Sequence, residues 1–366
     1  MQCMSSAPNG LCAYPIVQAP MAGGASCPPL AAAVCEAGGL GFLAGGYKTA
    51  DGMYQEIKQV RALTRRPFGV NLFMPQTGHV DPAAVEAYRG QLAGEASWYE
   101  ISLADEDIIG TCDDGYDAKL AILLEDPVPA VSFTFGCPAP AVLAALRGAG
   151  TYTVVTATSV EEARRAQEAG ADAVCVQGVE AGGHQGTHRD DPQADGTASV
   201  GLLALVAQVR EAVALPIIAA GGLMRGSQIA ALLAAGAEAA QLGTAFLACP
   251  ESGADPLHKK ALTDPLFVRT ELTRAFSGRP ARGLVNRFMR EHGPYAPAAY
   301  PQIHHLTSGL RKAAAAAGDP QGMALWAGQG HRLARALPAG ELMEVLTAEL
   351  AEAQSTLKAM QMRSAS

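Results

Sequence analysis

Aromatic and charged residues are both scarce in this 366-residue chain. Phe, Trp and Tyr make up 5% of the residues and Asp, Glu, Lys and Arg 17%, whereas 49% are hydrophobic. The formal net charge is −8 and there is no long basic run, which argues against binding to nucleic acid or to an acidic membrane surface. An anionic ligand would have to be held by local donors. The length and hydrophobicity predict a large core, in one large domain with a smaller one beside it.

Cysteine pairs and targeting signals are missing as well. The eight cysteines are scattered, with no Cys-x-x-Cys pair and no cysteine–histidine spacing of the zinc-binding type. Their mostly apolar surroundings favour free thiols in a reducing cytoplasm. No charged-then-apolar signal stands at the N-terminus. The most apolar stretch, 200–224, is interrupted by Gln208, Arg210 and Glu211, so we expect no membrane span.

Short apolar segments alternate with helical patterns over the first 250 residues. Glycine turns precede several of these segments, at Gly38, Gly150, Gly170 and Gly236, and glycine just past a helix end closes that helix in the left-handed conformation. This alternation is typical of βα units and a parallel sheet. The expected strands are 15–20, 40–44, 68–73, 130–135, 152–157, 173–178, 216–220 and 239–246. Eight units in about 240 residues favour a closed (β/α)8 barrel. An open doubly wound sheet is disfavoured because the Gly-x-Gly-x-x-Gly pattern is incomplete after the first strand.

The pattern changes near residue 250. We predict the barrel over 1–250, with 1–14 as a tail and 81–126 as a helical excursion longer than one crossover requires. Beyond it, 251–366 is expected to form a smaller, mainly helical domain or cap over the barrel mouth. The segments that read as helices there are 303–317, 319–336 and 339–361.

The strand expected at 173–178 leads into a loop of small residues that carries His184 directly after Gly182 and Gly183. Parallel α/β proteins place their chemistry at the C-terminal ends of strands, where a histidine can serve as a general base. A structural loop histidine is the alternative. His188, four residues on, suggests a metal, but no carboxylate or cysteine stands at ligand spacing, so we predict no metal site.

Glycines also follow the last two predicted strands. Gly221 and Gly222 end the seventh, and Gly243 and Thr244 lie at the end of the eighth. Loops at these positions of a barrel commonly bind phosphate through backbone N–H groups. Each glycine pair alone could be a plain turn, but together they favour a phosphate-bearing cofactor. Asn71 and Gln177, at other strand ends, could bind a flavin's pyrimidine edge or tie down loop backbone.

The few aromatic residues of the C-terminal region are concentrated at Tyr295, Tyr300 and Trp326. They could wall a pocket over the barrel mouth, or simply pack within the cap. His304 and His305 are adjacent, so on a helix they point in different directions. We expect these two histidines to be surface or packing residues.

Taken in order, these motifs resemble the nitronate monooxygenases, formerly called 2-nitropropane dioxygenases. The resemblance runs over 15–250, and the segment around Trp326 looks similar too. Its most specific part is the loop 177–186, Gln-Gly-x-Glu-Ala-Gly-Gly-His-x-Gly. Flavin-dependent enoyl-acyl-carrier-protein reductases and NADH:quinone reductases of the same barrel family carry close versions of this loop. The other matching segments are 20–24, 68–73, 219–222 and 241–244.

The resemblance implies a TIM barrel that holds FMN non-covalently. An alkyl nitronate would reduce the flavin, and O2 would complete its oxidation to a carbonyl compound and nitrite. His184 would be the catalytic base that removes the α-proton of a neutral nitroalkane, or, when protonated, would hold the nitro oxygens of a nitronate. By position, the FMN-binding residues would be Met21, Ala22, Asn71, Gln177, Gly182, Gly183, Gly221, Gly222, Gln241, Leu242, Gly243 and Thr244.

Two other functions remain open from the sequence. An NAD(P)H-dependent FMN reductase acting on an enoyl thioester or a quinone would need room for a nicotinamide over the flavin. The lack of a separate dinucleotide fingerprint does not discriminate, because this superfamily does not require one. A flavin- or phosphate-binding barrel without catalysis is the third possibility, and the intact loop around His184 argues against it.

Overall fold

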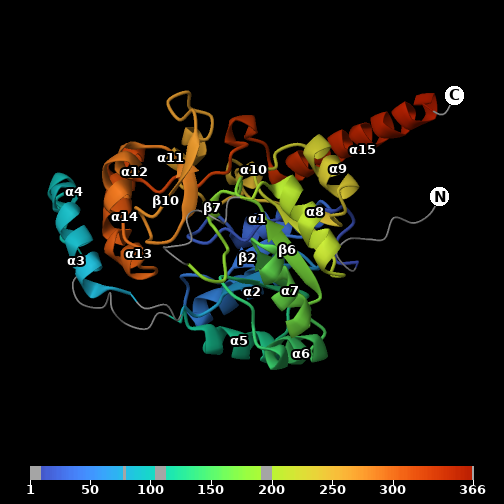
Figure 1. Cartoon of the computed structure of the whole chain (residues 1–366), viewed down its shortest axis with the longest axis horizontal. Helices are drawn as coiled ribbons and strands as arrows, with labels where there is room; N and C mark the ends of the chain where they lie inside the picture. Colours follow the sequence, from blue (N-terminus) through green and yellow to red (C-terminus); the bar gives the residue numbers. More distant parts are fainter. Residues whose placement is uncertain (1–9, 77–79, 104–112, 191–199, 365–366) are drawn as a thin grey trace.

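The computed structural model describes residues 10–76, 80–103, 113–190 and 200–364. Eight parallel strands form one sheet in the order β1-β9-β8-β6-β5-β4-β3-β2, and a parallel bridge from Val17 to Leu40 joins its two edges. This is the predicted (β/α)8 barrel (Figure 1). Its strands are β1 (Ile16–Gln18), β2 (Phe42–Ala44), β3 (Gly69–Phe73), β4 (Ala130–Thr134), β5 (Tyr152–Ala157), β6 (Ala173–Gln177), β8 (Ile217–Ala220) and β9 (Ala239–Leu242).

The barrel strands are buried on both faces, which explains their continuous apolar runs. Helices pack around them and share two hydrophobic clusters with the strands. Local signals set the helix ends: the Ser159 hydroxyl caps α7 by accepting from Glu162 N, and Gly170, at φ 90°, closes it. The surrounding helices are α1 (Pro28–Glu36), α2 (Ala50–Leu63), α5 (Tyr116–Glu125), α6 (Pro140–Gly148), α7 (Val160–Ala169), α8 (Leu202–Ala212), α9 (Gly226–Ala234) and α10 (Thr244–Leu247).

The predicted excursion 81–126 contains α3 (Pro82–Gln91), α4 (Ala93–Trp98) and α5, while 104–112 lie outside the described residues, as do 1–9 of the predicted tail. Helices α3 and α4 stand away from the barrel, beside the C-terminal helices (Figure 1). Tyr88 of α3 donates a hydrogen bond to Ala275 O at 2.8 Å, and its ring shares a cluster with Phe276 and Phe288. This part of the excursion therefore packs against the C-terminal region.

The region after 250 combines short helices with a small antiparallel sheet. Strands β10 (Thr270–Thr273) and β11 (Ala281–Leu284) pair with each other, and β11 also pairs with β7 (Gly183–His184) from the barrel loop. The single helix expected over 319–336 is wrong: only the 3-10 turns η3 (Pro320–Gly322) and η4 (His331–Leu333) form there. The other elements are α11 (Pro256–Ala261), α12 (Arg287–His292), η2 (Gly293–Tyr295), α13 (Gln302–Leu306) and α14 (Ser308–Ala316).

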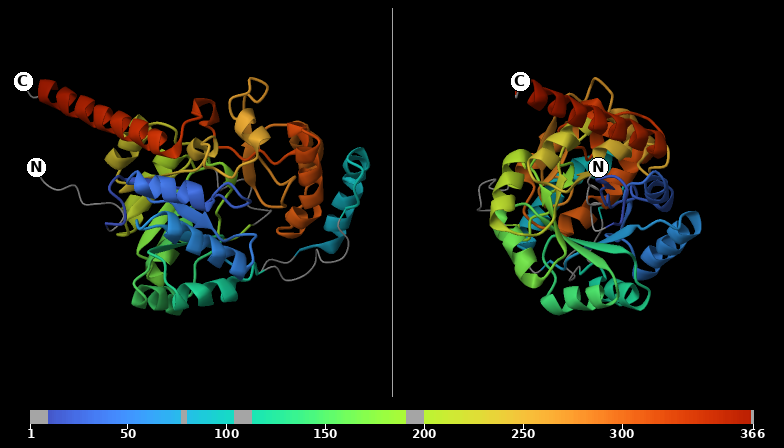
Figure 2. Two further views of the ribbon diagram at one scale, coloured as in Figure 1. Left: turned by 180° about the vertical axis from the view of Figure 1, so that it is seen from behind. Right: turned by 90° about the vertical axis from the view of Figure 1, so that its right-hand side faces the viewer.

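The last helix, α15 (Ala339–Ser364), returns to the barrel. It packs on α9 and α1 through Leu342, Met343, Leu346 and Leu350, which belong to the largest barrel cluster. Its C-terminal half extends beyond the body of the molecule (Figure 2). None of the described helices is long and apolar enough to cross a membrane.

Candidate active site

A cavity of about 330 Å³ lies at the C-terminal ends of the barrel strands, within the size range of small-molecule sites. The barrel contributes residues from the ends of most strands, and the C-terminal region supplies the opposite wall. The polar and aromatic lining residues are Tyr47, Asn71, Phe73, Ser132, Thr134, Phe135, Thr156, Gln177, His184, Gln241, Thr244, Asp255, His258, His304, Arg311 and Trp326.

The residues predicted to bind the cofactor converge on this cavity. Each of them lines it except Leu242. The side chain of Leu242 is 1% exposed and belongs to the core between strands and helices. This difference follows from the pleat, because successive residues of a strand point to opposite faces.

Backbone rather than side chains forms one wall of the cavity. Gly183, Gly221 and Gly222 have φ values of 73°, 146° and 68°, which side-chain-bearing residues rarely adopt. A Cβ on Gly182 would lie 2.5 Å from Gly328 N, so the loop packs directly on the chain after Trp326. Glycine is thus required here for both close packing and backbone conformation.

Both predicted amides make hydrogen bonds to neighbouring protein groups. Asn71 donates to Ser132 Oγ at 2.9 Å and to Thr134 Oγ1 at 3.0 Å. Gln177 donates to His184 O at 3.2 Å and accepts from Gly186 N at 2.7 Å. Gln177 therefore ties down the loop that carries His184, as one of the two sequence-based interpretations proposed, and it also faces the cavity.

His184 is held from three directions. Its backbone pairs with Ala281 of β11, and its Nε2 lies 2.9 Å from Ser277 Oγ. The imidazole is 5.6 Å from the ring centroids of both Tyr300 and Trp326. Burial lowers the pKa of His184 to about 3, with the positive charges of Arg279 and Arg311 adding to the effect. The imidazole is therefore neutral at physiological pH.

His188 does not join this site. Its Nε2 is 2.8 Å from Thr156 O, and its N–H donates to Glu162 Oε1 at 2.7 Å, so it fixes the loop against β5 and α7. Three other potential metal ligands, Glu95, Glu291 and His292, approach one another outside the cavity. Arg287 forms ion pairs with both carboxylates of that group, which accounts for their proximity.

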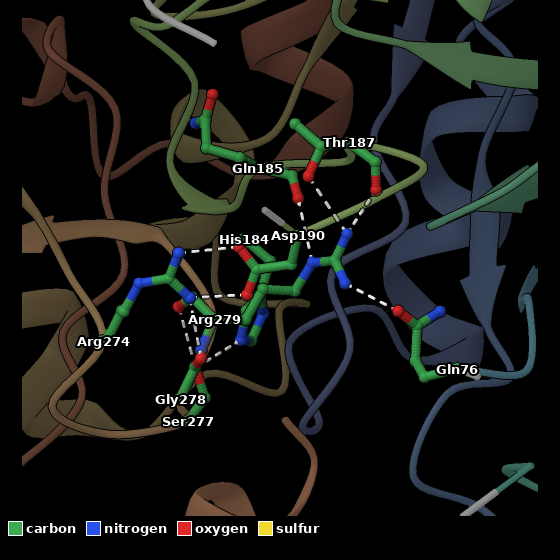
Figure 3. A network of polar contacts seen from close by, with 9 residues as sticks. All are labelled: Gln76, His184, Gln185, Thr187, Asp190, Arg274, Ser277, Gly278 and Arg279. Carbon is green, nitrogen blue, oxygen red and sulfur yellow. Dashed lines mark hydrogen bonds and ion pairs between the residues drawn. The ribbon is translucent and has the colours of Figure 1, made fainter. Parts of the chain in front are cut away.

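Arg279 is the centre of a polar network beside His184 (Figure 3). The residue is 1% exposed. Its guanidinium donates to Gln76 Oε1 at 2.7 Å, to Thr187 Oγ1 at 3.1 Å and to Gln185 O at 3.4 Å, and lies 4.2 Å from the centroid of the Phe135 ring. No ion pair joins it to a carboxylate in the part of the chain that is described. Because a guanidinium stays protonated in proteins, Arg279 places a positive charge in the protein interior.

Arg311 and the stacked rings of Tyr47 and His304 form another part of the cavity wall. Tyr47 stacks on His304 with centroids 4.0 Å apart, and its hydroxyl is 3.0 Å from that of Tyr300. Arg311 donates to His304 O at 2.8 Å and to Thr307 O at 3.4 Å through Nη2 and Nε. Its Nη1 has no hydrogen-bond partner among the described residues. The packing alternative expected for His304 is confirmed by its stack on Tyr47, and the residue also lines the cavity.

Several of these residues had no usable sequence signal. Arg279 and Ser277 belong to a basic turn that precedes β11, but β7, the barrel-loop strand with which β11 pairs, has only two residues. Tyr47 and Phe135 occupy left-handed backbone conformations, at φ 63° and 74°. Of the three C-terminal aromatics that the sequence singles out, Trp326 lines the cavity, Tyr300 contacts the lining residues Tyr47 and His184, and Tyr295 is exposed.

A closed parallel barrel with a cavity at the C-terminal ends of its strands is the arrangement of a small-molecule α/β-barrel enzyme. The sequence profile of the nitronate monooxygenase family matches residues 6–349. Nitronate monooxygenase from Pseudomonas aeruginosa is 44% identical, over 92% of this chain and 96% of its own. That from Paraburkholderia phytofirmans is 42% identical, over 94% of each chain. The chain belongs to the nitronate monooxygenase family.

Solved structures agree in fold. A structure of nitroalkane oxidase from Streptomyces ansochromogenes is 73% identical, with a TM-score of 0.92 over 95% of this chain and 99% of that one. FabK from Thermotoga maritima is 30% identical, with a TM-score of 0.72 over 95% and 96% of the two chains. The similarity therefore extends through the C-terminal region as well as the barrel.

Proposed function

We propose that the chain is an FMN-dependent enzyme that oxidises alkyl nitronates with O2 to a carbonyl compound and nitrite. We further propose that His184 is the base that removes the α-proton when the substrate is a neutral nitroalkane. The observation that carries this proposal is that His184 and Arg311 line the same cavity, and that Arg311 uses only Nε and Nη2 in its hydrogen bonds to described residues. A base and a fixed positive charge suit a substrate that becomes an anion when it loses a proton.

The residues present fit FMN. The glycines at 182–183 and 221–222 expose their backbone to the cavity, and a Cβ on Gly243 would meet no atom closer than Ala19 Cβ, at 3.5 Å. Thr244 adds a hydroxyl at the end of β9, although this hydroxyl accepts from Gly328 N at 2.9 Å. We propose that these groups hold the phosphate and that Asn71, Gln177 and Gln241 face the flavin ring. When bound, FMN would accept the electrons of the substrate and pass them to O2.

The positive charges act in different ways. The donors of Arg279 are engaged by Gln76, Thr187 and Gln185, so this residue contributes its field, which helps to keep His184 neutral. Arg311 lines the cavity and retains Nη1 for an acceptor on the substrate. An arginine held in place by its neighbours binds an anion at a smaller entropic cost than a free one. We infer that Arg311 binds the anionic part of a nitronate substrate.

An NAD(P)H-dependent FMN reductase remains the second candidate, supported by the similarity to FabK. One anaerobic experiment separates the two. The purified protein loaded with FMN is mixed with propionate 3-nitronate or with NADH, and the flavin absorbance is followed. We expect bleaching by the nitronate, and nitrite on admission of O2. Bleaching by NADH with no response to the nitronate would show that the first proposal is wrong.

A further inference from the structure

The hydroxyl of Ser277 lies between His184 and the backbone of Arg279 (Figure 3). Its Oγ is 2.9 Å from His184 Nε2 and 3.2 Å from Arg279 O. A carbonyl oxygen can only accept, and a serine hydroxyl has one proton to donate. The donor role of Ser277 is therefore used by Arg279 O. Toward His184, Ser277 Oγ is left as an acceptor.

The opposite orientation would leave a buried carbonyl without a donor. If Ser277 donated to His184, Arg279 O would lose the one hydrogen bond it makes among the described residues, and a buried acceptor without a donor destabilises the fold. Ser277 and Arg279 are each 1% exposed, so bulk solvent does not replace that donor. The favoured arrangement places the proton of the neutral imidazole on Nε2.

The turn that carries Ser277 is fixed by its neighbours. Arg274 donates to Gly278 O at 2.9 Å and pairs with Asp190, and Thr307 Oγ1 donates to Phe276 O at 2.6 Å. Gly278 has φ 77°, and a Cβ there would lie 2.5 Å from Ala299 O. The hydroxyl is therefore held at one position relative to the imidazole.

We propose that Ser277 is a positioning residue that fixes His184 as the Nε2–H tautomer and so makes Nδ1 the proton acceptor. This rests on the proposed base function of His184. The α-C–H bond of the nitroalkane breaks, its electron pair passes into the nitro group to give the nitronate, and the proton forms a bond to Nδ1. The resulting imidazolium keeps its Nε2–H bonded to Ser277 Oγ. No hydrogen bond among the described residues occupies Nδ1, and the ring lines the cavity.

The first test reads the tautomer directly. The FMN-loaded full chain is labelled with 15N-histidine, and the His184 signals are identified by their loss in His184→Asn. We expect the wild-type protein at pH 7.5 to show protonated Nε2 and unprotonated Nδ1. Protonation on Nδ1 would overturn the proposal whatever the enzyme's activity, and this measurement requires no variant of Ser277.

The second test asks whether Ser277 positions the imidazole of His184 or only supports the local fold. In Ser277→Ala we expect the Nε2–H preference to weaken and kcat for nitroethane to fall by ~10-fold or more, part of the ~10²–10⁴ that a general base contributes. Oxidation of pre-formed ethylnitronate, which needs no deprotonation, should change by less than ~2-fold, and Ser277→Thr should restore the tautomer. The matched control is Ser252→Ala, a buried serine outside the cavity whose hydroxyl also faces a carbonyl.

The outcomes keep the two proposals distinct. Unchanged kcat for nitroethane in Ser277→Ala, with the tautomer retained, would overturn the positioning role. Equal losses with nitroethane and ethylnitronate would show that Ser277 acts only structurally and would also overturn it. If the wild-type enzyme oxidises neither compound, the proposed function fails, whereas the tautomer is still read from the labelled protein.

Discussion

Asp114 accepts a hydrogen bond from the backbone N–H of Tyr47 at 2.8 Å, and its second oxygen binds the Nζ of Lys119 at 2.7 Å. Tyr47 needs such support because its φ of 63° is an unfavourable conformation for a residue with a side chain. Lys119 is 1% exposed. The C-terminal part of the 81–126 excursion thus holds Tyr47, which stacks on His304 in the cavity wall.

Removal of Asp114 should affect stability and substrate binding separately. Asp114→Ala leaves Lys119 buried and unpaired, so we expect the free energy of unfolding to fall by about 3 kcal/mol. In Asp114→Ala/Lys119→Leu the unpaired charge is gone and most of that stability should return. The Tyr47 N–H still lacks its acceptor, so KM for nitronate should stay raised by ~5-fold, the equivalent of one net hydrogen bond of about 1 kcal/mol. Urea unfolding and steady-state kinetics of both variants test this, and a KM that recovers together with stability would argue against it.

His184→Asn should impair oxidation of neutral nitroalkanes much more than oxidation of nitronates. The asparagine can still accept or donate at the site but cannot take up a proton at neutral pH. We expect FMN to be retained, kcat/KM for nitroethane to fall by ~10²–10⁴, and oxidation of ethylnitronate to persist. His305→Asn, an exposed neighbour of the cavity wall, is the matched control. Normal oxidation of nitroethane by His184→Asn would rule out the base.

Arg311→Met should weaken binding of the anion. Loss of a hydrogen bond to a charged group is worth ~1.5–3 kcal/mol, so we expect KM for a nitronate to rise by ~10- to 100-fold. Because neutral nitroethane lacks the charge, its KM should change less. Arg311→Lys should recover part of the loss, since it keeps the charge but not the planar donors. Lys312→Met removes an exposed neighbouring charge and serves as the control. Equal effects of the two methionine variants would contradict a specific role.

The sequence predicted the barrel well because each βα unit carries its own local signals. Apolar runs, cap residues such as Ser159 and glycine stops such as Gly170 act within a few residues of the element they define. The same locality predicted the cavity floor, since strand ends such as Asn71 and Gln177 must meet at one face of a closed barrel.

The opposite wall depended on contacts that no local pattern encodes. Ser277 reaches His184 because β11 pairs with a strand of two residues almost a hundred positions earlier in the chain. Asp114 bonds to Tyr47 across a separation of 67 positions. Nothing in the sequence separates His304 from its neighbour His305, whereas in the structure His304 stacks on Tyr47 and lines the cavity. These pairings arise from tertiary packing, which overrides the preferences of short segments.

The lowered pKa values of His184 and His304 should make the protein less stable at acidic pH. Burial, with positive charge from Arg311, lowers the pKa of His304 to about 2, and that of His184 is lowered to about 3. Both pKa values lie below the ordinary value of 6.5, so the unfolded chain binds protons at these sites before the folded one does. The stability that these groups contribute is present above pH 6.5 and is lost progressively as the pH falls toward 3.

We expect Tm to decrease between pH 7.5 and 4.5, and to decrease less in His184→Asn/His304→Asn. Thermal unfolding of both proteins at matched ionic strength tests this, with the FMN-free protein as a control for loss of cofactor. If Tm decreases by the same amount in the wild-type protein and in the double variant over that range, these histidines are not the source of the acid sensitivity.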